Sequence, residues 1–441
     1  MKKNIFKALA GTFISNGCII FCGFITGILT ARLLLPEGRG ALAAVLYWPQ
    51  IIAGIGLLSI HEAVTYRVGR DPDRRRKIVS SALWLALFLS IILSISGYLT
   101  IPWLLGLKRQ ELWSISRFYV LLYVPFNFVI LTLFALDHGL MRFSQYNIFR
   151  LSVPLLYLSG ILLLWFTGHV SVGMVVFVNL LSTVIVALVR MFMSGTELFM
   201  KPDFSEIWRL VKDALSFHGA AILVIAASQI DKFVVLKLWD NEFLGIYIVG
   251  LTVASSGLNM VGSTFHIVLF PSIAGSSQDQ QYKKLTEGIR QAMFMLFFIA
   301  VPLMLLAPYF VPFLFGYQFT PAGILAVYLL MAYSLVSLKT IVIRSLRGFG
   351  EGLPGTIAEL TALLLFLASV WPLSMQFGMI GVALALIFGN CGALLYLGIY
   401  LVQKHGVELR ELWGLTPLTA RQFYRALILY FQGQASDTKA R

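Results

Sequence analysis

The sequence carries little charge for its length. Only 12% of its 441 residues are charged, whereas 59% are hydrophobic, and the mean hydropathy is +0.84. Soluble domains carry about twice that share of charged residues, and a soluble fold of this size could not bury so much apolar surface. Negatively charged residues are scarcer than positively charged ones, with 20 Asp and Glu against 34 Lys and Arg. The composition therefore predicts a chain whose main solvent is lipid.

Cysteine is scarce as well. Cys18, Cys22 and Cys391 all lie within apolar stretches, which argues against a disulfide framework exposed to an oxidising compartment. Cys18 and Cys22 are one helical turn apart, but two soft ligands without a third are weak evidence for a metal. We interpret the cysteines as packing residues and expect no metal site.

The sequence lacks the motifs of nucleotide hydrolysis and of common hydrolases. It has no G-x-x-x-x-G-K-[ST] loop, no H-E-x-x-H pair and no nucleophile elbow. A long external loop, where a membrane enzyme usually holds its catalytic residues, is also missing. We therefore predict a transporter that is not an enzyme, needs no cofactor and does not hydrolyse ATP itself.

Apolar runs of about twenty residues fill most of the chain. They are apolar on all sides, unlike the alternating ten-residue segments of a membrane barrel, and so predict transmembrane helices. The run after Lys2, Lys3 and Lys7 is too long for a signal peptide, and we expect it to be retained as the first helix. The sequence predicts an all-α membrane protein of about twelve helices, at 8–34, 41–66, 78–105, 117–139, 148–167, 170–193, 215–239, 244–272, 290–314, 322–343, 355–376 and 379–402.

Basic residues are distributed unevenly between the connections of these helices. With a cytoplasmic N-terminus, the cytoplasmic segments hold 26 of the 34 Lys and Arg residues. The positive-inside rule then predicts cytoplasmic N- and C-termini. It also explains the net charge of +14 through anionic lipid head groups, without nucleic acid. The external segments hold Arg32, Arg39, Lys108, Arg109 and Arg117.

The longest cytoplasmic insert predicts a division of the chain. Asp203 and Glu206 have the spacing of a capping box. Phe204, Trp208 and Leu215 follow on one helical face, which is typical of a helix lying on the membrane surface. We predict an N-terminal six-helix bundle, an amphipathic linker, a C-terminal six-helix bundle and a cytoplasmic tail, at 1–193, 194–214, 215–402 and 403–441.

A weak internal repeat relates the two predicted bundles. A shift of 205 residues superposes three informative pairs, Glu37 with Glu242, Gly40 with Gly245, and His61 with His266. Six helices per bundle make the two repeats parallel, related by an axis along the membrane normal. Such halves predict a cleft between them and alternating access.

Several polar residues interrupt the apolar runs. An ionisable side chain at membrane depth is expensive and normally faces a cavity or a partner. A polar cleft for a charged head group would explain them, but so would pairing with a neighbouring helix or snorkelling to the interface. Asp231 and Lys232 are adjacent and point about 100° apart, so they need not pair. The candidate cavity residues are His61, Glu62, Gln229, Asp231, Lys232, His266 and Lys339.

Several stretches in order resemble the Wzx-type polysaccharide flippases. They are Ala31–Leu34 with Pro36–Gly40, Glu62–Tyr66, Gln229–Lys232 with Leu244–Tyr247, Phe270–Pro271, Leu314–Gly316, and Gly378 with Ile380–Ala383. The resemblance covers about residues 5 to 402. It implies the MOP flippase superfamily, with MATE-like architecture: two pseudo-symmetric six-helix bundles around a central cavity lined by the first, second, seventh and eighth helices.

The resemblance also implies a function. Such proteins move oligosaccharide linked to undecaprenyl pyrophosphate from the inner to the outer leaflet of the bacterial inner membrane, for surface polysaccharide biosynthesis. The expected partners are this polyprenyl-linked glycan, membrane lipids and a coupling cation, H⁺ or Na⁺. A cation-coupled exporter of small drugs on the same fold, with Asp231 as its ion site, is the main alternative. A membrane glycan polymerase or ligase is a further alternative, although it would be expected to carry a large external loop.

Overall fold

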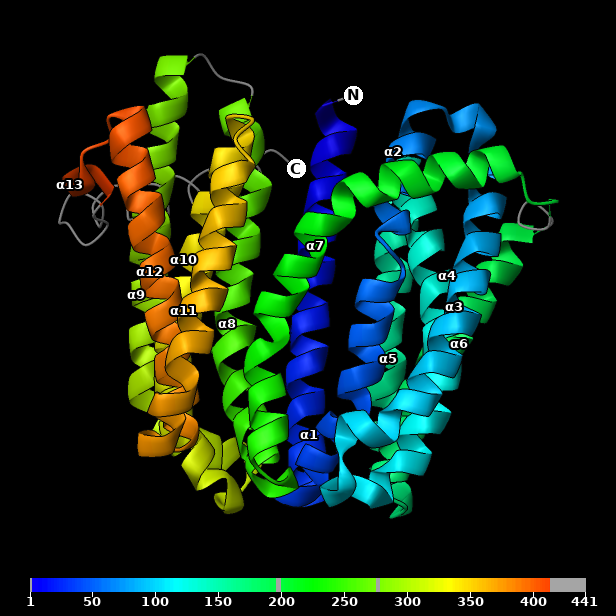
Figure 1. Ribbon diagram of the computed structural model, residues 1–441, viewed down its shortest axis with the longest axis horizontal. Helices are drawn as coiled ribbons and strands as arrows, with labels where there is room; N and C mark the ends of the chain where they lie inside the picture. The colour runs from blue at the N-terminus through cyan, green and yellow to red at the C-terminus, as the bar shows by residue number, and fades with distance from the viewer. Residues whose placement is uncertain (1, 196–199, 275–277, 413–441) are drawn as a thin grey trace, which may run out of the picture. The chain divides into compact units, whose positions relative to one another are not determined.

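The computed structural model describes residues 2–195, 200–274 and 278–412, and at 2–10, 217, 220, 259–274, 278–281, 409 and 411 it describes the backbone alone. These ranges form helices and short connections, with no strand among the described residues (Figure 1). Ten of their helices are long and apolar enough to cross a membrane, or up to eleven if a bent pair counts as one span. The prediction of an all-helical, multi-pass membrane protein is confirmed.

The first two predicted helices meet without a loop. α1 (Lys2–Gly56) contains both the first helix and most of the second, joined at Leu35, whose φ is 62°. Pro36 follows, and a proline disfavours helical backbone at the residue before it. The second helix therefore begins at Pro36, not at 41 as predicted. It also breaks where the sequence predicts continuity, because Leu58 and Ser59 both have positive φ before α2 (Ile60–Arg70) begins.

Four helices follow that match the predicted third to sixth spans closely. They are α3 (Arg75–Leu105), α4 (Trp113–Gly139), α5 (Phe143–Thr167) and α6 (Val172–Ser194). Short 3-10 turns, η1 (Pro72–Arg74) and η2 (Leu107–Leu112), precede α3 and α4. The helices keep their hydrogen bonds internal in lipid, and they reverse direction at glycines such as Gly106 and Gly168, which take positive φ.

α7 (Phe204–Leu238) is longer than its predicted span because the predicted surface helix continues into it. Its parts Phe204–Ser216 and Ala221–Leu238 are bent by 57°. The Asp203 side chain caps the start by accepting a hydrogen bond from the Glu206 amide, as the capping-box spacing predicts. α8 (Asn241–Ala274) follows after a short turn.

The remaining helices are α9 (Gln278–Phe315), α10 (Thr320–Gly348), α11 (Leu353–Phe377), α12 (Met379–His405) and the short α13 (Leu409–Leu412), with a 3-10 turn, η4 (Tyr317–Phe319), before α10. The first four contain the predicted ninth to twelfth spans, although α9 begins twelve residues before the predicted 290, and α13 was not predicted. Small residues let α11 and α12 approach closely, since a Cβ on Gly381 would meet the Leu373 carbonyl oxygen at 2.1 Å. The tail from 413 to 441 lies outside the described residues.

Packing groups the chain into two compact units. Unit 1 comprises Met1–Thr252 and Pro312–Ala322, and unit 2 comprises Val253–Val311 and Gly323–Arg441. Unit 1 thus holds the six helices of the predicted N-terminal bundle together with α7 and the start of α8. The predicted arrangement of two six-helix bundles joined by a linker at 194–214 stays a prediction.

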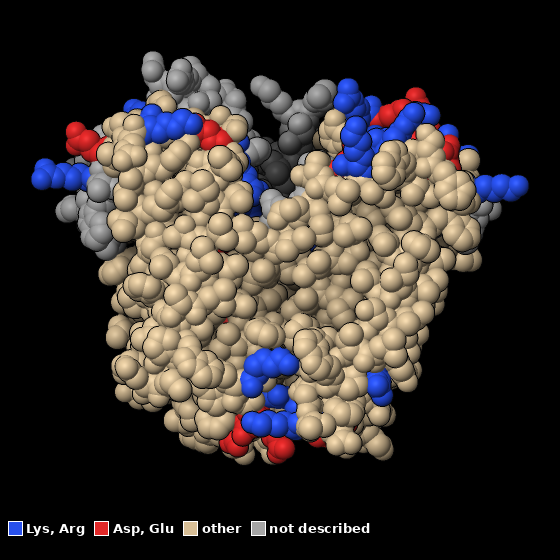
Figure 2. All heavy atoms as spheres, in the orientation of Figure 1, with Lys and Arg blue, Asp and Glu red and all other residues tan. Residues whose placement is uncertain are grey.

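Charged side chains are confined to the ends of the helices on the face that Figure 2 shows, and the band between is almost free of them. In unit 1 one end, which we call the basic end, contains the α2–α3 and α4–α5 connections with the exposed Arg70, Arg74 and Arg142. The opposite end contains η2 and the α7–α8 turn. This pattern agrees with a bilayer around the apolar band.

Candidate functional site

A polar group lies in the half of α7 that follows its bend. The Asp231 side chain is buried, and its carboxylate accepts a hydrogen bond of 2.7 Å from the Tyr247 hydroxyl of α8. The Gln229 backbone carbonyl accepts a hydrogen bond of 3.0 Å from the Tyr47 hydroxyl of α1. The sequence proposed the α7 residues as cavity residues but not these two tyrosines; Tyr247 lies on the next helix, whereas Tyr47 is 182 residues away from Gln229.

Lys232 points away from Asp231, as their adjacency on one helix requires. Its ammonium group donates hydrogen bonds to Gln229 Oε1 at 2.6 Å and to the Ser228 carbonyl oxygen at 3.1 Å. Both acceptors are neutral and belong to α7, and no carboxylate pairs with Lys232 in the described residues. The ammonium charge is therefore held in place by its own helix without being neutralised.

His61 and Glu62 form the first turn of α2, directly after the break at Leu58 and Ser59. His61 is half-buried, and its Nδ1 is enclosed without a hydrogen-bond partner among the described residues, while Glu62 is exposed. The sequence did not single out His218 of α7, which lies nearby: its Nδ1 is 3.4 Å from the Ser59 hydroxyl. The break in the second helix and the bend region of α7 are thus in direct contact.

The other two candidates lie on different helices. Lys339 of α10 is buried in unit 2 and forms an ion pair of 2.7 Å with Glu359 of α11. That contact is the pairing with a neighbouring helix which the sequence left open for Lys339. His266 belongs to α8, but its side chain lies outside the described residues. The structure therefore brings Gln229, Asp231 and Lys232 together and places His61 and Glu62 on α2.

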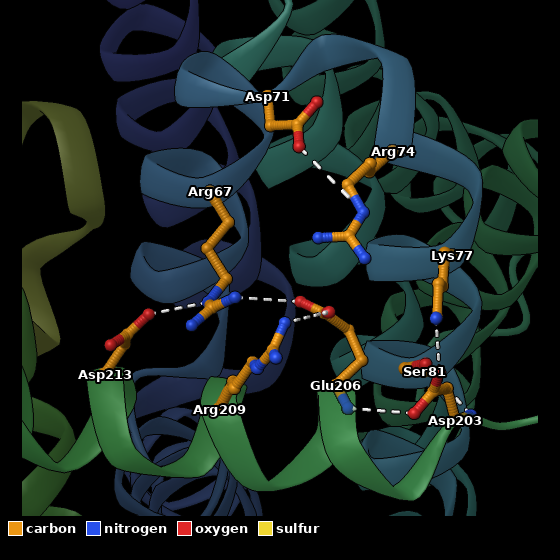
Figure 3. Close-up of polar contacts among 9 residues, drawn as sticks. All are labelled: Arg67, Asp71, Arg74, Lys77, Ser81, Asp203, Glu206, Arg209 and Asp213. Carbon is orange, nitrogen blue, oxygen red and sulfur yellow. Dashed lines mark hydrogen bonds and ion pairs between the residues drawn. The ribbon is translucent and has the colours of Figure 1, made fainter.

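A network of ion pairs fixes the surface part of α7 to α2 and α3 (Figure 3). Arg67 of α2 contacts Glu206 at 2.9 Å and Asp213 at 2.6 Å. Lys77 of α3 pairs with Asp203, and this hydrogen bond, assisted by the Glu206 amide, lowers the pKa of the Asp203 carboxyl. Beside the network lies a cavity of about 480 Å³, lined by Tyr66, Arg67, Arg70, Asp71, Arg74, Ile78, Glu206 and Asp213. The lining holds three arginines and three acidic residues, so the cavity is close to neutral.

At the opposite end of unit 1, two glycines cross in direct backbone contact. A Cβ on Gly40 would meet the Asn241 carbonyl oxygen at 1.7 Å, and one on Gly245 would meet the Pro36 carbonyl oxygen at 2.0 Å. Asn241 follows Pro36 by 205 residues, and Gly245 follows Gly40 by the same number. Each segment therefore makes the same contact with the other, as an isologous two-fold interface requires.

Arg109 fastens this crossing. Its guanidinium donates hydrogen bonds to Asn241 Oδ1 and to the carbonyl oxygens of Leu236 and Trp239, at 2.7, 2.8 and 2.9 Å. The sequence placed Arg109 in an external connection and did not predict its burial, but only 4% of it is accessible. Its role depends on an α7–α8 turn about 130 residues away, which no local pattern reports.

The helical fold and its apolar spans define a multi-pass membrane protein. Residues 29–323 match the family described as polysaccharide biosynthesis protein. This match covers more than half of the chain, and the protein belongs to that family. A comparison with curated proteins found no match.

Solved structures show the fold of the MOP superfamily. The lipid II flippase MurJ in an inward closed conformation has a TM-score of 0.74 at 13% identity, covering 97% of this chain and 93% of its own. An inward-facing MATE family multidrug resistance transporter has a TM-score of 0.69 at 16% identity, covering 86% and 93%. A MOP superfamily transporter from Pyrococcus furiosus, whose binding pocket is described as having reverse polarity, has a TM-score of 0.60 at 16% identity, covering 90% and 96%. At these identities the similarity shows the fold alone.

Proposed function

We propose that this protein flips an oligosaccharide linked to undecaprenyl pyrophosphate from the inner to the outer leaflet of a bacterial inner membrane. The observation that carries the proposal is the match of residues 29–323 to the polysaccharide biosynthesis family. A membrane step in that process has to carry a bulky polar head group while its lipid tail stays in the bilayer. The fold shared with a lipid II flippase supports the same class of substrate.

The charges on α7 suggest how the head group would be held. The Lys232 ammonium is available for a pyrophosphate oxygen because Ser228 and Gln229, its own partners, are neutral. A charge-assisted contact of this kind would be stronger than the hydrogen bonds it replaces. Asp231, fixed by Tyr247, is the candidate for a coupling H⁺ or Na⁺. The basic end of unit 1 would face the cytoplasm, and alternating access would expose the site to each side in turn.

Deletion of the gene tests the substrate. We expect loss of the surface glycan and accumulation of its lipid-linked precursor on the cytoplasmic leaflet, both reversed by the wild-type gene. Precursor can be quantified by mass spectrometry and its sidedness by lectin binding to sealed vesicles. Normal surface glycan together with new drug sensitivity would instead identify a small-molecule exporter. Accumulation of unpolymerised glycan on the outer leaflet would identify a polymerase or ligase.

Lys232→Met should reduce translocation at least tenfold with normal protein levels, because it removes a cation worth about 1.5–3 kcal/mol to a phosphate partner. Lys232→Arg should keep a substantial part of the activity, since it restores the charge. Surface glycan per molecule of transporter in the deletion strain is the measurement. Lys212→Met, at an exposed position on the surface part of α7, is the matched control. If Lys232→Met lowers glycan and protein in parallel, Lys232 is a structural residue.

A further inference from the structure

A second cavity lies at the basic end of unit 1, and arginines dominate its lining. Its volume is about 190 Å³, and it shares no lining residue with the cavity beside the α7 ion-pair network. The arginines are Arg75 and Arg76 of α3, Arg142 directly before α5, and Arg190 of α6. No acidic residue lines this cavity in the part of the chain that the structure describes, whereas the other cavity balances its arginines with acidic residues.

Two of these arginines differ in how they are held. Arg190 is buried, pairs with Asp137 and donates a further hydrogen bond to the hydroxyl of Ser194, which also lines the cavity. The exposed Arg142 takes part in no ion pair and in no side-chain hydrogen bond among the described residues. The cavity therefore combines a guanidinium that is fixed in place with one that is available to a ligand.

The ends of two helices add to this positive potential. α3 begins at Arg75, and α5 begins directly after Arg142. The residues before them, Arg74 and Arg142, provide no side-chain hydrogen bond to the amides of the first turn. Those amides and the helix dipole favour an anion at both N-termini. A concave surface lined by one sign of charge also concentrates ions of the opposite sign.

Exposed apolar side chains border the same cavity. Met193 lines it, Phe192 is its neighbour on α6, and Met141 directly precedes Arg142. Their exposed fractions are 59%, 89% and 66%. Apolar residues beside arginines are typical of the boundary between the hydrocarbon and the head groups of a bilayer. Basic pockets between membrane helices at this depth bind lipid phosphates.

From this lining we infer that the cavity binds a phosphate group, presented by an anionic membrane lipid or as a soluble ion. The guanidinium fork of Arg142 matches two phosphate oxygens, and Gln145 and Ser194 of the lining supply neutral donors. The volume suffices for a phosphate and some water, since one water occupies about 30 Å³ in the liquid. The inference does not rest on the proposed flippase function, because an exporter with this fold would keep the same cavity.

Thermal unfolding of the purified full-length protein in dodecyl maltoside, a detergent without phosphate, tests the site. Dioctanoyl phosphatidic acid, dioctanoylglycerol and inorganic phosphate are titrated separately, with sodium isethionate holding the ionic strength constant. We expect at least one of the two phosphates to raise the unfolding midpoint saturably, and dioctanoylglycerol not to do so. A response to phosphatidic acid alone indicates a lipid head group, whereas a response to inorganic phosphate indicates that the soluble ion suffices. No rise with either phosphate, or an equal rise with dioctanoylglycerol, overturns the proposal.

Variants locate the response. Arg142→Gln should weaken the apparent affinity about tenfold, because it removes a charge-assisted contact, and Arg142→Lys should retain part of it. Arg70→Gln is the matched control, since Arg70 is also exposed at the basic end but lines the other cavity. Wild-type affinity in Arg142→Gln, or equal weakening in Arg142→Gln and Arg70→Gln, would overturn the proposal. Should Arg142→Gln fail to fold, Arg76→Gln at another exposed position of the lining is judged by the same two outcomes.

Discussion

Gly40→Ala and Gly245→Ala are each expected to lower transport to less than a tenth of the wild-type level. A methyl group at either position would lie within 2.0 Å of a carbonyl oxygen of the other segment. Backbone atoms cannot rotate away as side chains do, so the two helices must separate. Overpacking of this kind costs about 1–3 kcal/mol, and more where relaxation is blocked. Surface glycan in the deletion strain measures the effect.

The loss should come from a changed conformation rather than from failed insertion. We expect both variants to reach the membrane, and the double variant Gly40→Ala/Gly245→Ala to be no worse than the more impaired single one, since one separation relieves both contacts. Gly23→Ala is the control, because no heavy atom lies within 4 Å of its new methyl group. Near-normal transport in both single variants would show that the crossing can open without cost.

Asp137→Leu should destabilise the protein by about 3–5 kcal/mol, the second large effect expected here. Asp137 and Arg190 are buried at the basic end of unit 1, where two hydrogen bonds of 2.6 and 3.0 Å join them. Removing the carboxylate leaves a guanidinium enclosed without its counter-charge. Reversible unfolding in mixed detergent micelles, followed by circular dichroism, measures the change.

The double variant Asp137→Leu/Arg190→Leu separates charge from packing. Replacing both members of a buried pair by apolar residues is often neutral, so much of the stability lost in Asp137→Leu should return. Glu62→Leu, at an exposed position of α2, should change stability by less than about 0.5 kcal/mol. A double variant as unstable as the single one would mean that volume, not charge, decides this site.

The helices could be predicted from the sequence because lipid imposes one rule on every span. Apolar runs of sufficient length have to be helical in a bilayer, and each predicted span lies on helical structure, with the second divided between α1 and α2. The errors in the predicted helix boundaries lie where one helical segment meets the next. Leu58 and Ser59 break the second helix without a proline or glycine at either position, so hydropathy cannot show the break. The predicted gap after Leu34 is closed because Pro36 begins a helix immediately.

The candidate site was predictable only as separate residues. Gln229, Asp231 and Lys232 stand out because polar and charged residues are rare in apolar runs, but Tyr247, the partner of Asp231, is ordinary in such runs. Arg39 was assigned to an external connection because it falls between the predicted spans 8–34 and 41–66, whereas it lies within α1 and is half-buried. Whether a polar side chain is exposed or packed against other helices depends on long-range packing. Hydropathy carries no information about that packing.

The break at Leu58 and Ser59 has a mechanical consequence. Two successive left-handed residues other than glycine cost about 1–3 kcal/mol each, so this segment persists only because its surroundings hold it. Ser59 contacts His218, and Arg67, two turns further along α2, is bound to Glu206 and Asp213. α2 is therefore held to α7 by a hydrogen bond at its start and by ion pairs two turns further along. The break thus separates the backbone of α2 from the span that precedes it, while side-chain contacts tie α2 to α7 both at its bend and before it.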